Sequence, residues 1–417
     1  MKNGVVIVGA GHAGVQAAAS LREDGYDGPV VLVSDENELP YHKPPLSKTF
    51  IKDGDARPQP LRGETFYTSS AIDFRPGIRI ERIDAGRRLL DIAGGGTLAF
   101  DHLVMATGSR PRVLPLPGSD LSGVVSLRSL NDARQIRELS ARSDEVVILG
   151  GGFIGLEIAA TLKAAGRAVT VVEAADRLLG RAVAPVVAGH VRLRLEATGV
   201  RILTGTTIAR LEGENGHVAA AITSTGERLP AHMVIVGVGA VPNVELAQEA
   251  GLAIANGIRV DHQMRSSAPQ ILAIGDAASY RHWFTGGDVR LESVQNATDQ
   301  ARLAARTISG HVDAYSAVPW FWSDIGDMKL QMVGLTAGGD SHVVLGDLPE
   351  NKFSIYHFAG DRLLGIESVN RPGDHMLGRK MLGAGFSPRP ETVALGPEGL
   401  KAALATFQQN GAARAAG

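Results

Sequence analysis

The stretch that decides the fold begins at residue 5 and reads Val5-Val6-Ile7-Val8-Gly9-Ala10-Gly11-His12-Ala13-Gly14. Its β-branched run predicts a buried strand, and its glycines predict a tight turn that opens a helix. A second apolar strand at residues 30–33 then leads to the acid Asp35. In such a unit the first glycine allows the bend, the second lets the backbone approach a pyrophosphate, and the third lets helix and strand pack closely. We therefore expect a dinucleotide to bind at Gly9, Gly11 and Gly14.

The same pattern occurs a second time, beginning with the strand Val146-Val147-Ile148-Leu149. The glycines of this copy are Gly150, Gly152 and Gly155, its helix runs to about residue 165, and its second strand ends at Glu173. A single glycine-rich turn is weak support for a nucleotide site, because such turns also arise for packing. Two complete copies, each with an acid placed for ribose hydroxyls, predict two Rossmann-like domains and two bound dinucleotides.

Two dinucleotide sites in one chain are what electron transfer between a nicotinamide and a flavin requires, since the two rings must stack. Glu173 favours NADH, because a carboxylate accepts hydrogen bonds from the ribose diol but repels the 2′-phosphate of NADPH. Arg177 and Arg181 follow closely and would soften that repulsion, unless they are ordinary surface arginines.

The composition excludes several classes of protein. At 417 residues, with 44% hydrophobic and 21% charged residues, the chain is typical of a globular protein of two or three domains. A net charge of −2 gives no overall attraction to nucleic acid, and no stretch approaches the roughly 20 apolar residues that cross a membrane. The chain starts almost directly with a strand, so we expect no targeting segment and a cytoplasmic location.

The chain contains no cysteine. Its absence excludes disulfide exchange, thiolate nucleophiles and iron–sulfur clusters held by the chain itself. The 12 histidines include no ligand pair, so we assign no metal. Any redox centre is therefore expected to be a bound organic cofactor.

The pattern along the chain predicts an α/β fold in three parts. Residues 1–112 and 241–319 are expected to form a discontinuous FAD-binding domain, in which a strand near residues 271–274 completes the first sheet. Residues 113–240 are expected to bind NADH. From residue 320 the sequence pattern changes to short segments of alternating apolar and polar residues, which predict strands, including a hairpin with its turn at Gly360-Asp361. This pattern predicts a C-terminal α+β domain. Both nucleotide domains are expected to be three-layered.

Six blocks in a fixed order carry a resemblance to a known family. They are the two glycine fingerprints and the stretches Leu39-Pro40-Tyr41-His42-Lys43-Pro44-Pro45-Leu46-Ser47-Lys48, Met105-Ala106-Thr107-Gly108-Ser109-Arg110-Pro111, Ala273-Ile274-Gly275-Asp276 and Pro319-Trp320-Phe321-Trp322-Ser323-Asp324. In these blocks the chain resembles FAD-dependent ferredoxin reductases of the putidaredoxin reductase type. The resemblance spans nearly the whole chain and is less regular at residues 50–88 and after residue 386.

The resemblance implies roles for individual positions. Asp35 is expected at the adenosine ribose of FAD, Lys48 at the edge of the flavin ring and Ile80 near the adenine. The other FAD positions are Gly9, Gly11, Ala13 and Gly14 at the pyrophosphate, and Arg128, Asp276, Val294 and Trp322 around the flavin. Two of these positions also have ordinary structural explanations. Lys48 would be a solvent-exposed lysine at the start of a helix, and Asp276 would cap a helix.

Lys48 and Glu157 are the candidate catalytic pair. Glu157 follows the second fingerprint on the helix turn expected to face the nicotinamide, although an acid there also suits a helix N-terminus. We hypothesise that Lys48 and Glu157 form an ion pair beside the flavin ring, with the lysine offsetting charge on the reduced flavin. Trp320 and Trp322 alternate with Phe321, so on a strand the two tryptophans share one face, either for packing at a domain junction or at the flavin edge.

The resemblance also implies the electron acceptor, a 2Fe–2S ferredoxin that supplies a haem monooxygenase or a related oxygenase. Because such ferredoxins are acidic, a transient electrostatic encounter with a basic surface is expected. Candidate residues are Arg62, Arg302, Arg379 and Lys380, each of which is otherwise ordinary surface charge. Alternatives sharing the two-nucleotide fold are a rubredoxin reductase, an NADH oxidase-like flavoenzyme, a protein like apoptosis-inducing factor and a redox-sensing flavoprotein.

Overall fold

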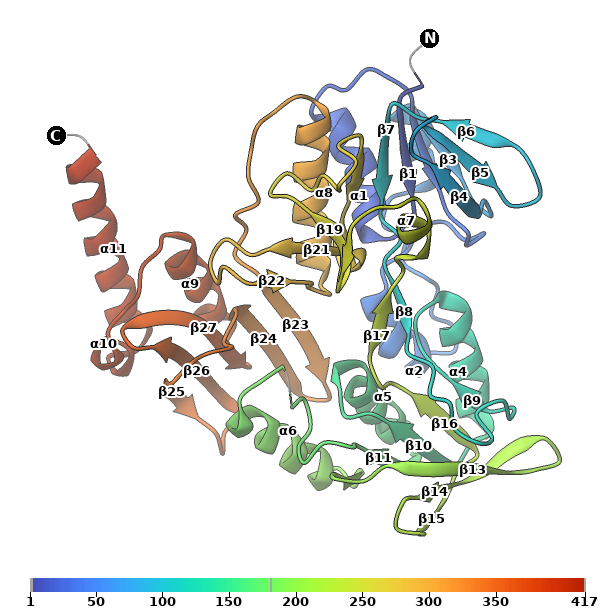
Figure 1. The fold of residues 1–417 in the computed structure, drawn as a ribbon. Helices are drawn as coiled ribbons and strands as arrows, with labels where there is room; N and C mark the ends of the chain where they lie inside the picture. The colour runs from blue at the N-terminus through green and yellow to red at the C-terminus, as the bar shows by residue number, and fades with distance from the viewer. Residues whose placement is uncertain (1–2, 181, 416–417) are drawn as a thin grey trace. The chain divides into compact units, whose positions relative to one another are not determined.

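The computed structural model describes residues 3–180 and 182–415, and it divides the chain into two compact units (Figure 1). The first unit contains Met1–His42, Arg57–Arg110 and Ala240–Ala317. The second contains Lys43–Ala56, Pro111–Gly239 and Val318–Gly417. Each unit is therefore assembled from segments that lie far apart in the sequence.

A five-stranded parallel sheet forms the centre of the first unit, with β1 as its middle strand. The strand order is β20–β7–β1–β2–β3, and β20 comes from the segment after residue 240, as predicted. β1 is buried along its length because both faces of a parallel sheet are covered. The strands are β1 (Val5–Val8), β2 (Val30–Val33), β3 (Ile72–Arg75), β7 (His102–Met105) and β20 (Ile271–Ala273).

Two long helices of the first unit, α1 (His12–Glu23) and α8 (Val294–Ile308), pack against each other beside this sheet (Figure 1). Their buried faces are rich in alanine, which allows the two backbones to approach closely. The N-terminal end of α1 directly follows β1, so the glycine turn lies at the carboxyl edge of the sheet, where α/β folds bind their ligands.

Smaller elements complete the first unit. A three-stranded antiparallel sheet has the order β4–β5–β6, and a four-stranded sheet has the order β18–β19–β21–β22. Their bounds are β4 (Ile80–Asp84), β5 (Leu89–Ile92), β6 (Thr97–Ala99), β18 (Ile254–Ala255), β19 (Gly257–Val260), β21 (Ala278–Arg281) and β22 (Asp288–Val289), with α3 (Glu64–Ser69), α7 (Glu245–Glu249) and η2 (Gly275–Ala277) between strands.

The second unit repeats the parallel architecture, with the order β12–β11–β10–β16–β9 and β10 at the centre. A three-stranded antiparallel sheet, β13–β14–β15, is inserted before β16. The elements are α4 (Leu130–Arg142), α5 (Phe153–Ala164), α6 (Pro185–Ala197), β9 (Val124–Val125), β10 (Glu145–Leu149), β11 (Ala168–Val172), β12 (Arg201–Leu203), β13 (Ile208–Glu214), β14 (His217–Thr223), β15 (Arg228–Pro230) and β16 (Met233–Val236).

The C-terminal part of the second unit is an antiparallel sheet of order β23–β24–β27–β26–β25. The predicted hairpin is confirmed as β26 and β27, which pair up to Ala359 and Arg362 on either side of Gly360-Asp361. The elements are β23 (Trp320–Ile325), β24 (Met328–Gly334), β25 (Ser341–Asp347), β26 (Lys352–Ala359), β27 (Arg362–Val369), α9 (Pro372–Gly383), α10 (Pro390–Ala394) and α11 (Gly396–Ala415). The predicted α/β fold with an α+β C-terminal part is thus confirmed.

One hydrophobic cluster joins the parallel sheet and the C-terminal antiparallel sheet of the second unit. It contains Ile148 and Leu156 from the parallel-sheet part and Leu330 and Phe353 from the antiparallel sheet, all less than 2% exposed. Ile51 also belongs to it, carried by the short helix α2 (Thr49–Lys52) that follows η1 (Pro44–Ser47). Residues 43–56 therefore belong with the second unit, although they follow the first fingerprint in sequence.

Two of the points at which the chain passes between units can be set beside the predicted domain bounds, which stay a prediction. The chain passes between units after Arg110 and before Ala240, near β8 (Ser109–Pro111) and β17 (Ala240–Pro242), compared with predicted breaks after residues 112 and 240. The assignment of FAD to residues 1–112 and 241–319, and of NADH to residues 113–240, stays a prediction. Within the part of the chain that the structure describes, no helix has the length and apolarity needed to span a bilayer.

Candidate functional site

The first glycine-rich turn has the geometry of a dinucleotide cradle. Gly9 has a φ of +103°, and a Cβ on Gly14 would lie 1.9 Å from the carbonyl oxygen of Gly9. A Cβ on Gly11, in contrast, would meet no atom within 4 Å. Helix α1 starts directly after Gly11 without a side-chain cap, so its first amides remain available to an anion. The turn thus offers both space and donors where a pyrophosphate would bind.

The second turn repeats this geometry. Gly150 has a φ of +106°, a Cβ on Gly155 would lie 2.5 Å from the Gly150 oxygen, and Gly152 faces open space. Helix α5 likewise begins without a side-chain cap. The backbone roles expected of the six glycines are therefore observed in both copies, and the residues fit a dinucleotide at each turn. That these turns bind FAD and NADH stays a prediction.

The acids that follow the two second strands differ in environment. Asp35 is exposed after β2. Glu173 is half-buried after β11, where its Oε2 accepts a hydrogen bond from the Gly151 amide at 2.6 Å and its Oε1 accepts one from the Ala175 amide at 2.8 Å. Glu173 is thus fixed beside its own glycine turn, with further lone pairs for ribose hydroxyls.

Arg177 is held by the loop that contains it. Its Nη1 donates to the Val183 carbonyl at 3.0 Å, and its Nη2 donates to the Gly180 carbonyl at 2.5 Å. Arg181, the other arginine considered for coenzyme choice, lies outside the described residues. Two nitrogens of the Arg177 guanidinium are therefore bound to carbonyls of its own loop.

Three segments of the first unit meet around η2. A Cβ on Gly275 would lie 3.1 Å from Ala13 Cβ in α1 and 3.7 Å from Ala297 Cβ in α8. The next residue, Asp276, accepts a hydrogen bond from Ser109 Oγ at 3.0 Å. The structure therefore brings the predicted positions Ala13 and Asp276 together near the start of α8, whose first residue is Val294.

Ile80 begins β4 and is 6% exposed within the core of the first unit. Arg128, in the second unit, immediately precedes α4, whose start is fixed by a capping box between Ser129 and Asp132. Its backbone amide donates to Asp132 Oδ2, and its carbonyl accepts from Lys43 Nζ at 3.3 Å. These contacts fix the backbone at Arg128, and the cofactor roles of Ile80 and Arg128 stay predictions.

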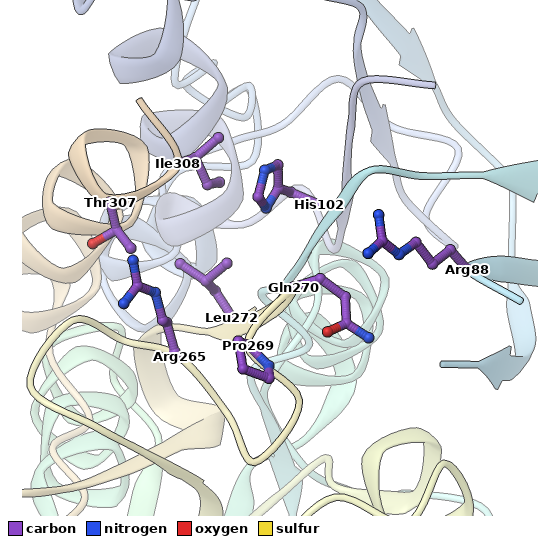
Figure 2. A pocket seen from close by; sticks show the side chains of 8 residues that line it. All are labelled: Arg88, His102, Arg265, Pro269, Gln270, Leu272, Thr307 and Ile308. Carbon is purple, nitrogen blue, oxygen red and sulfur yellow. The ribbon is translucent and has the colours of Figure 1, made fainter. Parts of the chain in front are cut away.

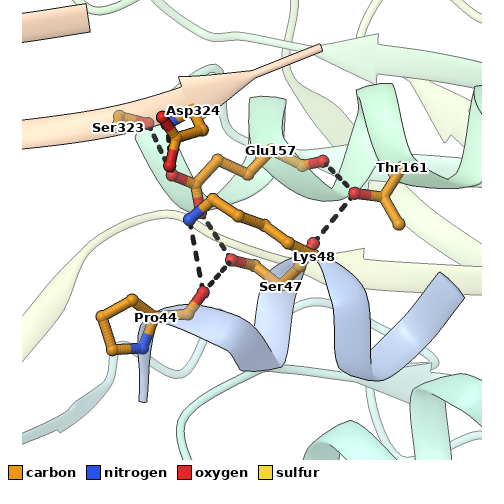
Figure 3. Close-up of polar contacts among 7 residues, drawn as sticks. All are labelled: Pro44, Ser47, Lys48, Glu157, Thr161, Ser323 and Asp324. Atoms are coloured by element: carbon orange, nitrogen blue, oxygen red, sulfur yellow. Dashed lines mark hydrogen bonds and ion pairs between the residues drawn. The ribbon is translucent and has the colours of Figure 1, made fainter. Parts of the chain in front are cut away.

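The hypothesised ion pair is present in the second unit (Figure 3). Lys48 Nζ lies 2.8 Å from Glu157 Oε2, and the lysine side chain is 21% exposed whereas the glutamate side chain is 7% exposed. Lys48 Nζ also donates to the carbonyl oxygen of Pro44 at 3.3 Å. The carboxylate of this ion pair is therefore buried, and the lysine ammonium is the partner that is partly exposed to solvent.

Two serines hold the Glu157 carboxylate from opposite sides. Ser47 Oγ donates to Oε2 at 2.5 Å, and Ser323 Oγ donates to Oε1 at 2.6 Å (Figure 3). The Asp324 amide lies 3.3 Å from the same Oε1. Together with Lys48, these donors satisfy both carboxylate oxygens, which fixes the orientation of the carboxylate.

Each partner of Glu157 comes from a different element. Ser47 ends the 3₁₀ helix η1, which two prolines start, while Ser323 lies on β23 and Glu157 on the first turns of α5. Thr161 Oγ1, one helical turn beyond Glu157, lies within hydrogen-bond distance of the carbonyls of both Ser47 and Glu157, at 3.1 and 2.8 Å. The cluster therefore ties η1, α5 and β23 to one another.

Trp320 and Trp322 share one face of β23, as predicted. Their ring centroids are 5.5 Å apart, and the Arg379 guanidinium lies over the Trp320 ring at 4.7 Å. His375 meets the edge of Trp320 at 5.6 Å, and burial, helped by Arg379, lowers the pKa of His375 to about 4. Trp320 thus packs among α9 side chains, whereas the flavin role predicted for Trp322 stays a prediction.

The four candidate cations for ferredoxin lie on both units. Arg62 and Arg302 belong to the first unit, where Arg62 lies over the Phe66 ring and Arg302 pairs with Asp299 at 2.8 Å. Arg379 and Lys380 are exposed neighbours on α9 of the second unit. All four are exposed at the surface, and their role in partner binding stays a prediction.

A cavity of about 320 Å³ opens in the first unit, away from the glycine turn (Figure 2). It lies at the amino ends of β7 and β20 and at the C-terminal end of α8, the edge of the sheet opposite to the turn. None of the predicted site residues lines it. Its lining residues are Arg88, His102, Arg265, Pro269, Gln270, Leu272, Thr307 and Ile308.

Sequence reasoning missed the two serines that hold Glu157. Both lie inside blocks that were singled out, Ser47 directly before Lys48 and Ser323 directly after Trp322. The hydrogen-bond partner of a serine cannot be inferred from the residues next to it in sequence. The one indication of a role for these serines was that each lies within a block shared with the family.

Two family models match the chain. The model described as pyridine nucleotide-disulphide oxidoreductase matches residues 3–301, and the model described as reductase C-terminal matches residues 320–404. The first match spans both glycine-rich turns, and the second covers the antiparallel sheet and most of the helices that follow it. Nearly the whole chain is therefore accounted for by two consecutive models.

Two curated relatives are similar over most of their length. Rhodocoxin reductase of Rhodococcus erythropolis is 43% identical over 96% of this chain and 94% of its own. Rubredoxin-NAD(+) reductase of Pseudomonas putida is also 43% identical, over 88% of this chain and 96% of its own. The names of these two relatives give different electron carriers, rhodocoxin and rubredoxin.

Two solved structures superpose closely. The ferredoxin reductase for the CYP199A2 system from Rhodopseudomonas palustris has a TM-score of 0.94 at 44% identity and covers 97% of this chain and 100% of that one. The covalent putidaredoxin reductase-putidaredoxin complex has a TM-score of 0.93 at 37% identity and covers 96% of this chain and 98% of that one. The likeness extends beyond the glycine-rich turns to the whole fold.

Proposed function

Since the chain belongs to the pyridine nucleotide-disulphide oxidoreductase family, and its relatives are reductases of small redox proteins, we propose that it passes electrons from NADH through FAD to a 2Fe–2S ferredoxin. The observation that carries this proposal is the repetition of one open, uncapped glycine turn in a chain without cysteine. Two dinucleotides would bind, but the chain has no cysteine thiol or disulfide to receive electrons. The acceptor must therefore be another molecule.

The residues that would hold FAD begin with Gly9, Gly11, Ala13 and Gly14 at the pyrophosphate. Asp276, held by Ser109, would lie beside them, and Asp35 is exposed where a ribose would bind. Ile80, Arg128, Val294 and Trp322 are proposed to complete the site. When bound, a flavin supplies the ability to take up two electrons together and to release them singly.

Lys48 and Glu157 are proposed to set the electrostatics of the reaction site. Lys48 would place positive charge where the reduced cofactor is negative, and Glu157 would fix the position of the lysine ammonium. No general acid or base is obligatory for hydride transfer, so orientation and charge are expected to supply most of the catalysis.

NADH is proposed as the donor, bound at Gly150, Gly152 and Gly155. Glu173 is fixed beside the turn and Arg177 is bound to its own loop, so a 2′-phosphate would meet a carboxylate without a free guanidinium from Arg177. Glu173→Ala tests this proposal, since kcat/KM for NADPH relative to NADH should rise. An unchanged ratio would count against Glu173 as the selecting residue.

A ferredoxin is proposed as the acceptor, with a haem monooxygenase or related oxygenase downstream. Similarity to a ferredoxin reductase over 97% of the chain supports this choice. Rubredoxin is the second candidate, because a relative named rubredoxin-NAD(+) reductase is 43% identical. A cytoplasmic location is proposed as well, where NADH is available.

The experiment that tests the proposed cofactors is direct. Purified protein should show the absorption spectrum of bound flavin, and NADH should bleach it faster than NADPH does. Protein folded without flavin would contradict the FAD assignment. Slow bleaching accompanied by a change of oligomeric state would instead favour a redox-sensing flavoprotein.

A further inference from the structure

One peptide group, between Val183 and Ala184, is held on both of its sides. Its carbonyl oxygen, on Val183, accepts the hydrogen bond from Arg177 Nη1 at 3.0 Å. Its amide, on Ala184, donates to Glu367, with Oε2 at 2.9 Å and Oε1 at 3.1 Å. The peptide group therefore connects the Glu367 carboxylate to the Arg177 guanidinium.

Glu367 lies in the C-terminal sheet, on β27, and is only 2% exposed. Its carboxylate points to the N-terminal end of α6, where Ala184 is the cap residue and has no side-chain oxygen of its own. A carboxylate at a helix N-terminus is stabilised by the free amides and by the helix dipole. Glu367 thus fixes the backbone at the start of α6 and the end of the loop that precedes it.

The other end of that loop is also fixed. The Leu179 amide donates at 3.0 Å to the carbonyl of Gly151, the same residue whose amide donates to Glu173. The carbonyls of Gly180 and Val183, which lie between these anchors, both accept from Arg177. Because the loop is tied at both ends, the Arg177 guanidinium keeps its two carbonyl partners on the loop.

We propose that Glu367 is a positioning residue for coenzyme choice, which retains Arg177 on the loop through the Val183–Ala184 peptide group and so withholds a cation from the 2′-phosphate of NADPH. This inference rests on the proposed function, because it takes the second glycine turn as the nicotinamide dinucleotide site. It assigns a role in nucleotide selection to a residue of the C-terminal sheet.

Nucleotide binding tests the inference without catalysis. Calorimetry on the full-length flavoprotein would compare 5′-AMP with adenosine 2′,5′-bisphosphate, which differ in the 2′-phosphate. Glu367→Leu should raise the affinity for the bisphosphate relative to AMP about two- to fivefold, the range expected of a partly exposed ion pair. Glu367→Gln should keep the wild-type ratio, because its amide oxygen still accepts from the Ala184 amide.

A second variant covers the case in which Glu367→Leu does not fold. Ala184→Pro removes the amide itself, and the φ of Ala184, −61°, already suits proline. It should raise the ratio as Glu367→Leu does. In either background Arg177→Leu should cancel the rise. Ser354→Ala, which disturbs the same sheet at the Ser354–Ser368 hydrogen bond, should leave the ratio unchanged.

The outcomes separate the inference from the function on which it rests. An unchanged ratio in the folded variants, with AMP still bound, would overturn the role of Glu367 alone. A rise that persists with Arg177→Leu would overturn it as well. Failure of the wild-type protein to bind AMP would overturn the assignment of the second nucleotide site, and this inference with it.

Discussion

Lys48 and Glu157 form an ion pair with 2.8 Å between Nζ and Oε2, although they come from distant parts of the sequence. The carboxylate is the better buried partner, and it is bound by donors from two further positions, Ser47 and Ser323. A surface ion pair held only by its own two charges is worth little. The Lys48–Glu157 pair is fixed by a surrounding hydrogen-bond network. We therefore expect the position of the charges, more than the free energy of the ion pair, to determine its effect on the reaction.

Glu157→Gln tests the pair most simply. The amide is almost the same size but carries no charge, so the Lys48 ammonium should lose its fixed position and flavin reduction by NADH should slow about tenfold or more. Stopped-flow absorbance would measure the rate and the charge-transfer band. Glu350→Gln, at an exposed glutamate of the same unit, serves as the control. Wild-type rate and spectrum in Glu157→Gln would contradict a role at the reaction site.

Ser323→Ala removes one of the donors to Glu157 and leaves the ion pair chemically intact. We expect a smaller loss than with Glu157→Gln, about threefold in the rate of flavin reduction, with the KM for NADH little changed. Ser323→Thr retains the hydroxyl and should restore most of the rate. If Ser323→Ala and Ser323→Thr behave alike, the hydroxyl does not orient the carboxylate.

Acid should destabilise the protein through its buried histidines. Burial lowers the pKa of His375 and of His282 to about 4, whereas an unfolded histidine titrates near 6.5. Between these values the unfolded chain binds more protons, so stability is complete above about pH 6.5 and is lost as the pH falls towards 4. After allowance for solvent screening, each histidine should contribute about 1–2 kcal/mol.

Urea unfolding followed by tryptophan fluorescence at pH 7 and pH 5 would measure this loss, since His375 contacts Trp320. His375→Gln should lose less stability between the two pH values than the wild type. His311→Gln, at an exposed histidine, should behave like the wild type. Equal losses in all three proteins would show that His375 does not cause the acid sensitivity.

Salt should slow the reduction of an acidic ferredoxin if basic residues steer the encounter. Between 0.05 and 0.3 M salt we expect a fall of up to about tenfold in kcat/KM for ferredoxin, and little change for the small acceptor ferricyanide. Lys380→Gln should weaken the salt dependence, and the matched change Lys329→Gln should not. The same slope in both variants would exclude Lys380 from the docking surface.

The sequence predicted the fold well where local patterns determine it. Strand, glycine turn and helix are contiguous, so both nucleotide units could be recognised from spacing alone, and the C-terminal hairpin was visible in its alternating residues and its glycine turn. The completion of the first sheet by β20 was also predicted, from the strand-like residues 271–274.

Contacts between distant segments could not be predicted in the same way. Residues 43–56 pack with the second unit through buried side chains such as Ile51, which nothing in their neighbourhood in sequence indicates. The hydrogen bonds from Ser323 to Glu157 and from Ala184 to Glu367 depend on how sheets and helices pack. The Lys48–Glu157 pair was predicted because the family resemblance placed Lys48 at the flavin edge and Glu157 follows the second fingerprint on the helix turn expected to face the nicotinamide.

The measurement that tests the central claim most directly is the NADH-driven rate of reduction of a 2Fe–2S ferredoxin, compared with that of a rubredoxin at equal concentration. The proposed function predicts rapid turnover with a ferredoxin and a kcat/KM at least about tenfold higher than with rubredoxin. Faster reduction of rubredoxin, or no reduction of either carrier by a protein that holds FAD, would contradict it.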